Sequence, residues 1–260
     1  MAANAGVLEQ FRMDGRVALV VGGTRGLGRS IAEGLAEAGA TVALCSRHLE
    51  EARAVAHELE RETGRQTLGL AADVASEGEV TRLFADVHDR LGAVDALVNS
   101  AGINARYPIE ECPLEEFRRV IEVNLTGTWL CCRAAMACMK AQGRGAIVNV
   151  GSALSAIGLP ERTPYCSSKA AIIGLTQTVA LEGAPHGVRC NALCPGPFLT
   201  EMNRPLLAEP EKVAAILRRT ALNRWAEMHE IRGAALFLAS DASSFMTGAA
   251  LYLDGGWTAQ

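Results

Sequence analysis

The segment Val17–Gly28 reads VALVVGGTRGLG and decides the fold. Its first five residues form an apolar run, which is typical of a strand buried on both faces of a parallel sheet. Glycines follow as Gly22-x3-Gly26-x-Gly28, and residues 26–38 then predict a helix that ends before Gly39. A glycine turn between strand and helix lets the backbone approach a phosphate held on helix N–H groups. The spacing differs from the commonest dinucleotide fingerprint, Gly-x-Gly-x2-Gly, and a glycine cluster alone indicates a plain structural turn about equally well.

Strand-like and helical segments alternate along the whole chain. This alternation is typical of an α/β fold with a doubly wound parallel sheet, here a Rossmann fold of about seven strands with helices on both faces. No repeat or linker-like stretch interrupts it, so residues 1–260 are predicted to form one domain, with 1–13 as an N-terminal extension. Strands are predicted at residues 17–21, 41–45, 67–72, 95–99, 146–150, 188–193 and 249–253, and helices near 26–38, 48–63, 77–91, 113–142, 164–184, 204–219 and 227–239.

A tyrosine and a lysine stand four residues apart in Tyr165-Cys166-Ser167-Ser168-Lys169. Residues 170–175 continue with helical periodicity, so both side chains are expected on one helix face, about 5–6 Å apart at Cβ. A free tyrosine has a pKa near about 10 and exchanges protons poorly at neutral pH. A fixed cation beside it favours the phenolate, which suits the pair to moving a proton to or from a substrate oxygen. Taken alone, the motif indicates an ordinary surface pair more often than a catalytic one.

Further polar and glycine-rich elements accompany this pair near the ends of predicted strands. Ser152 follows the strand 146–150 and comes thirteen residues before Tyr165. The carboxyl ends of strands are where open α/β sheets bind their ligands. In chain order the elements are the glycine turn, Asn99-Ser100-Ala101-Gly102, Asn124, Ser152, Tyr165-x3-Lys169 and Pro195-Gly196-Pro197.

In order and spacing, these elements resemble the short-chain dehydrogenase/reductase family in its single-domain form. The resemblance runs from about Gly15 to the tail at residues 253–256. Two residues depart from the family pattern, because Val21 stands where Thr is usual before the first glycine and Ser100 stands where a second Asn is common. Neither position has a catalytic role in the family, so the departures concern the packing of the cofactor loop.

The resemblance implies a catalytic set of Asn124, Ser152, Tyr165 and Lys169. Ser152 and Tyr165 would bind the substrate oxygen, and Tyr165 would act as general acid in reduction or general base in oxidation. Lys169 would lower the pKa of Tyr165 and bind the nicotinamide ribose, while Asn124 would hold a water that links Lys169 to solvent. Ser155 is a rival to Ser152, but the interval to Tyr165 favours Ser152.

The resemblance also implies a nicotinamide dinucleotide along the carboxyl edge of the sheet. Residues 197–226 correspond to the family's substrate lid, although a plain surface connection would show the same weak regularity. Gly196, Phe198 and Thr200 resemble the segment that clamps the nicotinamide amide. The implied cofactor-binding residues are Gly22, Thr24, Arg25, Gly26, Leu27, Gly28, Ser46, Arg47, Asp73, Val74, Asn99, Ala101, Gly102, Tyr165, Lys169, Pro195, Gly196, Phe198 and Thr200.

The end of the second predicted strand indicates which nicotinamide is used. NAD-selective folds place an acidic residue about 20 residues past the glycines, where it holds the ribose 2′-hydroxyl. Here that place reads Ser46-Arg47, and the first carboxylate is Glu50. Guanidinium pairs well with a 2′-phosphate, and Arg25 lies in the neighbouring glycine turn, so NADP(H) is favoured, although exposed arginines are common on any surface. Asp73 resembles the family's adenine-contacting Asp, while an isolated Asp is more often a turn or cap.

Composition and charge exclude several classes of protein. The 260 residues carry a net charge of −4 with a pI near 5.8, which provides no basic footprint for nucleic acid. No apolar run reaches the about 18 residues of a membrane span, and residues 1–13 show no signal-peptide pattern. The eight cysteines form no Cys-x2-Cys pair, so neither a metal site nor a disulfide framework is predicted. A cytoplasmic protein is expected, in which Cys166 beside Tyr165 is the thiol that reagents would affect.

Two helical stretches are apolar almost all round, residues 129–139 and many positions of 170–181. A helix without a polar face is buried on every side, which the outer layer of a single domain does not provide. Members of the resembled family bury these helices against symmetric partners, which implies a homotetramer or a homodimer. Burial by the chain's own sheet accounts for part of the pattern.

Arg106 and Arg162 are candidates for binding a substrate anion. Arg106 lies just beyond the fourth predicted strand, and Arg162 lies three residues before Tyr165. Together with residues 197–203 they resemble sugar-acid dehydrogenases of the gluconate type, because a carboxylate paired with Arg would orient a keto acid. Surface pairing is the competing interpretation, favoured for Arg162 and about equal for Arg106, with partners Glu110, Glu111 or Glu161.

Three functions remain open from the sequence. The favoured one is an NADP(H)-dependent oxidoreductase that interconverts a small carbonyl compound and a secondary alcohol by hydride transfer, with Tyr165 as general acid/base. The second is an NAD-preferring sugar or sugar-acid dehydrogenase of the same fold. The third is a catalytically silent protein that senses a dinucleotide, against which the intact set of Asn124, Ser152, Tyr165 and Lys169 argues.

Overall fold

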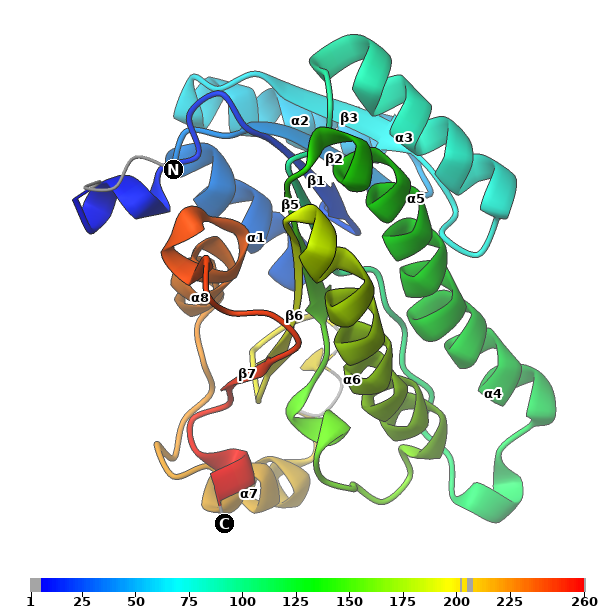
Figure 1. Ribbon diagram of the computed structural model, residues 1–260. Helices are drawn as coiled ribbons and strands as arrows, with labels where there is room; N and C mark the ends of the chain where they lie inside the picture. Colours follow the sequence, from blue (N-terminus) through cyan, green and yellow to red (C-terminus); the bar gives the residue numbers. More distant parts are fainter. Residues whose placement is uncertain (1–5, 202, 205–207, 260) are drawn as a thin grey trace.

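The computed structural model describes residues 6–201, 203–204 and 208–259, and within these it contains one parallel sheet of seven strands (Figure 1). The strand order is β3-β2-β1-β4-β5-β6-β7, which confirms the predicted doubly wound fold. Every predicted strand is present, and its ends differ from the prediction by at most two residues; Asp95 and Ala249, for example, lie one residue before the strands that begin at Ala96 and Ala250. The strands are β1 (Val17–Val21), β2 (Thr41–Ser46), β3 (Thr67–Ala71), β4 (Ala96–Asn99), β5 (Gly145–Val150), β6 (Val188–Pro195) and β7 (Ala250–Leu253).

The strand order reverses at β1, which pairs with β2 on one side and with β4 on the other. All five residues of β1 are buried, because helices cover both faces of the sheet. In open α/β sheets the crevice outside the carboxyl ends at such a reversal is the place for a ligand. The glycine turn after β1 and the Asn99–Gly102 segment after β4 therefore lie at this position.

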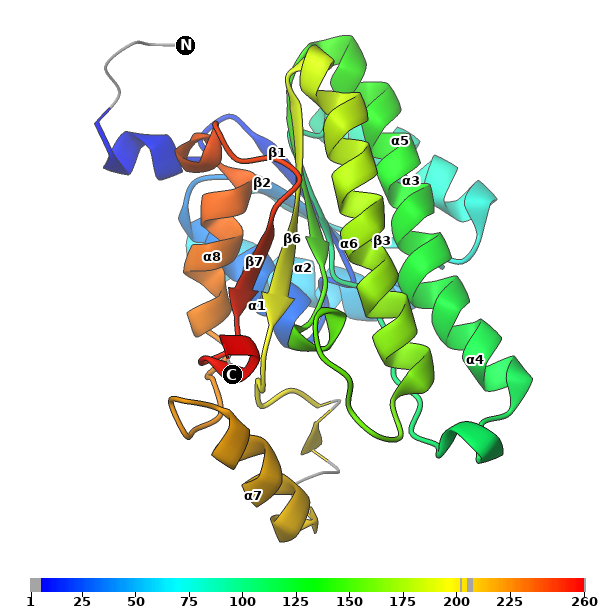
Figure 2. The same ribbon diagram turned by 60° about the horizontal axis from the view of Figure 1, so that its bottom comes forward.

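Helices cover both faces of the sheet and form two outer layers (Figure 1, Figure 2). Each layer has its own apolar core against the sheet, because the strands present side chains alternately to the two faces. Helices α2 and α5 end at Gly64 and Gly143, whose φ angles of 68° and 70° suit glycine. One layer holds α1 (Gly26–Glu37), α2 (Leu49–Thr63) and α8 (Glu230–Ala239); the other holds α3 (Glu77–Leu91), α5 (Gly127–Gln142) and α6 (Thr163–Gly183).

The helix predicted over residues 113–142 is divided by a π-helical turn. Helix α4 (Leu114–Ile121) leads into the turn η3 (Glu122–Thr126), from which α5 continues. Single π turns of this kind occur often at functional sites. Here the turn contains Asn124, which is completely buried. The apolar periodicity of the sequence contained no signal for this interruption.

Residues 197–226 form an excursion from the sheet whose first and last residues are hydrogen-bonded to each other. Phe198 and Ala226 form an isolated parallel bridge, the N–H of Ala226 donates to the carbonyl of Pro197 at 2.9 Å, and that of Leu199 donates to Ala226 at 3.3 Å. The helix predicted over 204–219 includes residues 205–207, which lie outside the described residues. Its described part is α7 (Pro210–Arg219), and the helix predicted from 227 begins at Glu230.

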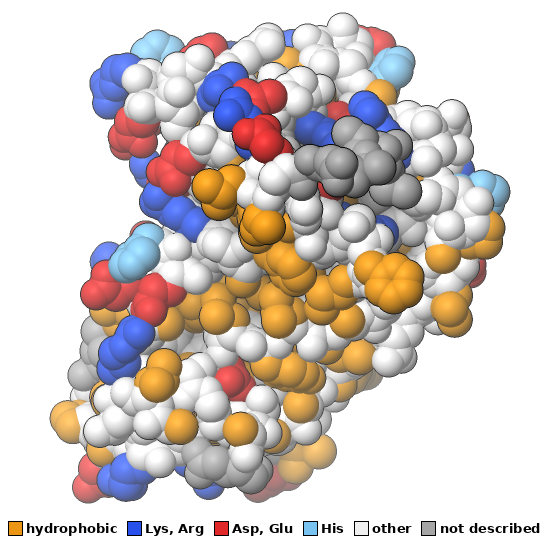
Figure 3. Space-filling view, turned by 60° about the vertical axis from the view of Figure 1, so that its left-hand side comes forward, with side chains coloured by type: hydrophobic (Ala, Val, Ile, Leu, Met, Phe, Trp, Pro, Cys, Tyr) orange, Lys and Arg blue, Asp and Glu red, His pale blue; other side chains and the backbone are white. Residues whose placement is uncertain are grey.

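The segment expected as an N-terminal extension partly belongs to the core, and its residues 1–5 lie outside the described residues. The short helix η1 (Leu8–Phe11) places Phe11 against Phe237 of α8, with ring centroids 6.4 Å apart, and Met13 is completely buried. The face that carries α8 shows hydrophobic side chains gathered in a band (Figure 3). Among the described helices, none combines the length and the hydropathy needed to cross a membrane.

Candidate active site

The glycine turn forms a cradle in which Gly22 and Gly28 pack closely against neighbouring backbone, while free space lies beside Gly26 at the start of α1. A Cβ on Gly22 would lie 2.7 Å from Cα of Ala101, and one on Gly28 would lie 2.1 Å from the carbonyl oxygen of Gly22. Gly26, with φ +56°, begins α1, and a Cβ there would meet no atom within 4 Å. No side chain caps the helix at Arg25, and its first turn holds no acidic residue. This end of α1 therefore fits the pyrophosphate of a dinucleotide.

The end of β2 lies directly beside this cradle. The N–H groups of Gly22 and Gly23 both donate to the carbonyl of Cys45, at 3.0 and 3.2 Å. Arg25 and Arg47, on these two segments, are exposed, and neither takes part in an ion pair with any described residue. The two guanidiniums predicted for a 2′-phosphate are thus on neighbouring segments at the same edge.

Glu51 is a residue of this region that the sequence reasoning missed. The hydroxyl of Ser46 lies 3.4 Å from Oε2 of Glu51 in the first turn of α2 and also donates to the carbonyl of His48 at 3.1 Å. A carboxylate therefore turns back toward the end of β2, although the sequence there shows no acid until Glu50. In the sequence, Glu51 differs from other acidic residues only in that it follows Ser46 by five residues. A loop lies between them, so this spacing does not fix where the two side chains lie.

Tyr165 and Lys169 lie on the same side of α6, as predicted from their spacing. The ammonium of Lys169 is 5.8 Å from the centroid of the Tyr165 ring and donates to the carbonyl of Val150 at 2.7 Å. Lys169 is buried, while Tyr165 is half-buried. The end of β5 therefore holds the lysine beneath the tyrosine.

The phenol of Tyr165 does not have the lowered pKa that its pairing with Lys169 was expected to give. Burial raises the pKa of Tyr165 to about 12, while its hydrogen bond with Ser152 acts in the opposite direction. Burial also lowers the pKa of Lys169 to about 8. The desolvation of the phenolate outweighs the attraction of a lysine that is itself desolvated. Spacing in the sequence predicted the pair but contained nothing about the depth of its burial.

Ser152 lies at the start of the short helix η4 (Ala153–Ser155), within reach of Tyr165. Its Oγ accepts from the N–H of Leu154 at 3.1 Å. Ser155, considered as its rival, accepts from the N–H of Ser152 at 3.2 Å and donates to the carbonyl of Lys169 at 2.7 Å. Ser155 therefore joins the Ser152 turn to α6, and the pattern of a capping box could have indicated this role.

Asn124 lies beside the same group. A Cβ on Gly102 would be 3.4 Å from Oδ1 of Asn124 and 3.7 Å from Nζ of Lys169. The amide nitrogen of Asn124 donates to Ile103 O and to Ser168 Oγ, both at 3.0 Å, and its Oδ1 accepts from Ile103 N at 2.8 Å. Both amide protons are thus engaged within the protein. The water that Asn124 was expected to hold stays a prediction.

Several predicted cofactor residues direct their side chains into the core. The amide of Asn99 donates to Asn149 Oδ1 at 2.9 Å, Val74 packs against Gly127, and Phe198 is 1% exposed. Any contact of these three with a cofactor would come from the main chain. Asp73 accepts from the N–H of Ala75 at 3.0 Å, as expected for a residue that stabilises its own turn.

The remaining predicted positions lie along the same edge of the sheet. Thr24 is buried and Leu27 packs partly against the core under the glycine turn. Gly196, after Pro195 at the end of β6, could not carry a Cβ, which would lie 2.4 Å from Cα of Asp254. The N–H of Thr200 donates to the carbonyl of Phe198 at 2.9 Å.

The surface pairing favoured for Arg162 is wrong. Arg162 is 6% exposed, its Nη1 donates to the carbonyl of Glu161 at 3.0 Å, and no carboxylate among the described residues forms an ion pair with it. The carboxylate of Glu161 instead lies 3.8 Å from Lys212 of α7. Arg106 is half-buried. Only the packing of three segments around the start of α6 explains this burial, so a sequence pattern could not indicate it.

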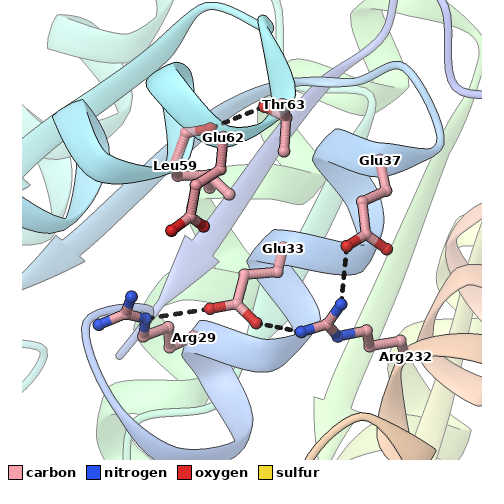
Figure 4. A pocket seen from close by; sticks show the side chains of 7 residues that line it. All are labelled: Arg29, Glu33, Glu37, Leu59, Glu62, Thr63 and Arg232. Atoms are coloured by element: carbon pink, nitrogen blue, oxygen red, sulfur yellow. Dashed lines mark hydrogen bonds and ion pairs between the residues drawn. The ribbon is translucent and has the colours of Figure 1, made fainter.

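A hollow of about 390 Å³ lies away from these residues, between α1, α2 and α8 (Figure 4). Its walls are charged, but Glu33 accepts from both Arg29 and Arg232, and Arg232 also binds Glu37. Four of the lining charges, those of Arg29, Glu33, Glu37 and Arg232, therefore pair with one another, and none of the lining residues belongs to the predicted site. Among the described residues, no three His, Cys, Asp or Glu side chains are grouped as metal ligands would be.

Comparison with known proteins places this geometry among dehydrogenases. Residues 21–258 match a family described as enoyl-(acyl carrier protein) reductase. The chain is 38% identical over 248 residues to D-threitol dehydrogenase of Mycolicibacterium smegmatis, covering 95% of each, and 36% identical over 248 residues to gluconate 5-dehydrogenase of Gluconobacter oxydans, covering 95% of this chain and 96% of that one. The crystal structure of a gluconate 5-dehydrogenase from Burkholderia cenocepacia with NADP and tartrate superposes with a TM-score of 0.95 at 37% identity, covering 98% of this chain and 100% of that one.

Proposed function

The chain belongs to the short-chain dehydrogenase/reductase family, and from this membership we propose that it is an NADP(H)-dependent oxidoreductase that interconverts a secondary alcohol and a carbonyl compound. One observation carries the proposal. Tyr165, with Ser152 hydrogen-bonded to it and Lys169 beneath it, lies at the same sheet edge as an open glycine cradle. A proton-transferring group and a dinucleotide site are the two parts that this reaction requires.

The cofactor would supply the hydride acceptor or donor, and the chain's own groups would handle the proton. In oxidation, Tyr165 as phenolate would take the proton of the substrate hydroxyl. The carbon that bears this oxygen would give its hydride to the oxidised cofactor and become the carbon of a ketone. In reduction, Tyr165 returns the proton to the carbonyl oxygen. Ser152 would hold that oxygen by a hydrogen bond. Since the pKa of Tyr165 lies at about 12, its deprotonation depends on Ser152 and on Lys169, which carries its charge below about pH 8.

The exposed Arg25 and Arg47 support NADP(H), since a guanidinium matches a 2′-phosphate. The similar gluconate 5-dehydrogenase holds NADP. A second candidate, an NAD-preferring sugar or sugar-acid dehydrogenase, is favoured by Glu51, whose carboxylate turns toward the end of β2. An acid at this place would hold a ribose 2′-hydroxyl and repel a 2′-phosphate.

We further propose a homotetramer, with a homodimer as the alternative. The layer of α5 and α6 presents Trp129 and Leu181, 45% and 76% exposed, and the layer of α8 presents the hydrophobic band of Figure 3. Two apolar faces on opposite sides of the sheet suit an assembly with two kinds of twofold interface. All eight cysteines are among the described residues and are free, which supports the proposed cytoplasmic location.

The test follows nicotinamide absorbance with NADP(H) and NAD(H) against D-gluconate, D-threitol and simple ketones. Turnover that is faster with the phosphorylated cofactor is expected. Faster turnover with NADH would favour the second candidate, and binding of a dinucleotide without turnover of any substrate would favour a silent sensor. Light scattering at micromolar concentration tests the assembly, which a 27.5 kDa monomer would contradict.

A further inference from the structure

The start of α6 holds a buried positive charge that the proposed chemistry does not use. We propose that Arg162, together with Arg106, forms an anion subsite that selects substrates carrying a carboxylate close to the reacting carbon. This inference rests on the proposed function and names its substrate class. Arg162 is the specificity-determining residue.

Arg162 is desolvated and forms no ion pair with a carboxylate of the described residues. Its side chain is 6% exposed, and of five N–H donors only one has a described partner, the carbonyl of Glu161 at 3.0 Å. A buried charge is costly unless it is paired. The carboxylates of Glu161 and Glu209 are half-exposed, and both interact with Lys212, at 3.8 and 2.7 Å. Both carboxylates attract the charge of Arg162, but neither forms an ion pair with it.

A second cation faces the same place. The charge of Arg106 acts with burial to lower the pKa of Arg162, because two like charges repel each other. The N–H of Tyr107, next to Arg106, donates to the carbonyl of Glu161 at 3.2 Å, the same oxygen that accepts from Arg162. This shared acceptor fastens the 103–107 segment to the start of α6. Two like charges held together in this way are stabilised by an anion between them.

The backbone here is held in an unfavourable conformation. Glu161 has a φ of +61°, in the left-handed region that residues other than glycine seldom adopt. Strain of this kind persists where the surrounding structure requires it, and it clusters at binding sites. At Glu161 it directs one carbonyl toward both Arg162 and the N–H of Tyr107.

The position of Arg162 limits the size of the ligand. It stands at the N-terminal boundary of α6, one turn before Tyr165. Because the two side chains start within one helical turn, a ligand that reaches both would carry its carboxylate close to the carbon whose oxygen Tyr165 binds. Lys212 and Glu209, from the 197–226 segment, border the same place. Small hydroxy acids and keto acids, sugar acids included, fit this arrangement better than long neutral alcohols.

The experiment compares each acid with a neutral counterpart of the same length, D-gluconate with D-glucitol and acetoacetate with methyl acetoacetate. It uses enzyme with saturating cofactor and the variants Arg162→Gln and Arg162→Lys. Arg162→Gln should lower kcat/KM for the acids by about 10- to 100-fold, mainly through KM, and should affect the neutral substrates much less. Arg162→Lys should recover part of the loss. Arg53→Gln, which removes an exposed guanidinium on α2, is the matched control.

Equal losses on acids and neutral substrates would show that Arg162 only fastens the loop, and would overturn the inference. A wild-type enzyme without preference for the acids would overturn it as well. If no substrate is turned over, the proposed function fails separately. Calorimetry of D-gluconate and tartrate on the NADP⁺-loaded protein then still decides, because binding that does not weaken in Arg162→Gln contradicts the subsite.

Discussion

The two ends of the candidate site place their charges in different surroundings. At the nucleotide end, Arg25 and Arg47 are exposed on segments that follow β1 and β2. At the catalytic end, Lys169 and Arg162 are 5% and 6% exposed beneath α6 and its neighbouring loops. An exposed charge costs little and is screened by salt, whereas a buried one has a shifted pKa and a large effect on its neighbours. Exchange of charged residues at the nucleotide end should therefore change cofactor preference and leave the stability of the fold unchanged, whereas exchange at the catalytic end should change stability as well.

The largest effect is expected from Tyr165→Phe, at the buried end. The substitution removes only the transferable proton, so turnover should fall by about 10²- to 10⁴-fold while NADPH binding, followed by fluorescence, stays close to wild type. Tyr252→Phe, on β7, is the control and should retain turnover. Near-native turnover of Tyr165→Phe would show that proton transfer does not depend on this residue.

A smaller effect follows from the buried ammonium and appears as a pH dependence of stability. The pKa of Lys169 is about 8 in the folded protein and 10.5 for an unperturbed lysine side chain, so the unfolded chain binds more protons between these values. Stability due to this residue therefore rises with pH over about 8 to 10.5, by at most about 3 kcal/mol. Urea unfolding at fixed protein concentration should show that the free energy of unfolding of wild type, minus that of Lys169→Met, rises over this pH range. A difference that stays flat or falls would contradict the burial argument.

What could be predicted from the sequence depended on how local the cause was. The strand at Val17–Val21, the glycine turn after it, and the common face of Tyr165 and Lys169 follow from periodicity within one element, and the structure has all of them. Each requires only that neighbouring residues adopt a regular backbone. The doubly wound order could be predicted for the same reason, because the alternation of elements leaves few topologies.

The features that sequence reasoning missed depend on packing between distant segments. The burial of Arg162 needs the loop at Tyr107 and the segment that contains Lys212. The raised pKa of Tyr165 reflects desolvation by its surroundings, which a spacing of four residues does not encode. The π turn at Glu122–Thr126 likewise interrupts a helix whose sequence is regular. The catalytic end was therefore predicted in its composition but not in its electrostatics.

The exposed end is tested first by Arg47→Gln. If Arg47 contacts only the 2′-phosphate, as proposed, its loss should lower kcat/KM with NADPH by about 10- to 100-fold and change kcat/KM with NADH by less than about threefold. Arg53→Gln, exposed on the adjacent α2, should weaken neither. Equal losses for the two cofactors would show that Arg47 acts on the fold of the β2 end rather than on the phosphate.

The smallest effect is expected from Glu51→Gln. This substitution tests whether the carboxylate of Glu51, as well as the guanidiniums of Arg25 and Arg47, acts on the cofactor at the nucleotide end. Oε2 of Glu51 lies 3.4 Å from the hydroxyl of Ser46, beside the place assigned to the 2′-phosphate. Removing a partly exposed negative charge there should improve kcat/KM for NADPH by about two- to fivefold, since such interactions are worth at most about 1 kcal/mol. The gain should shrink as salt is raised, because screening acts on exposed charges. Glu50→Gln, one residue earlier with an 86% exposed side chain, is the control and should change neither cofactor. A loss of NADH turnover in Glu51→Gln instead would mean that this carboxylate holds the ribose 2′-hydroxyl, and would favour the NAD-preferring alternative.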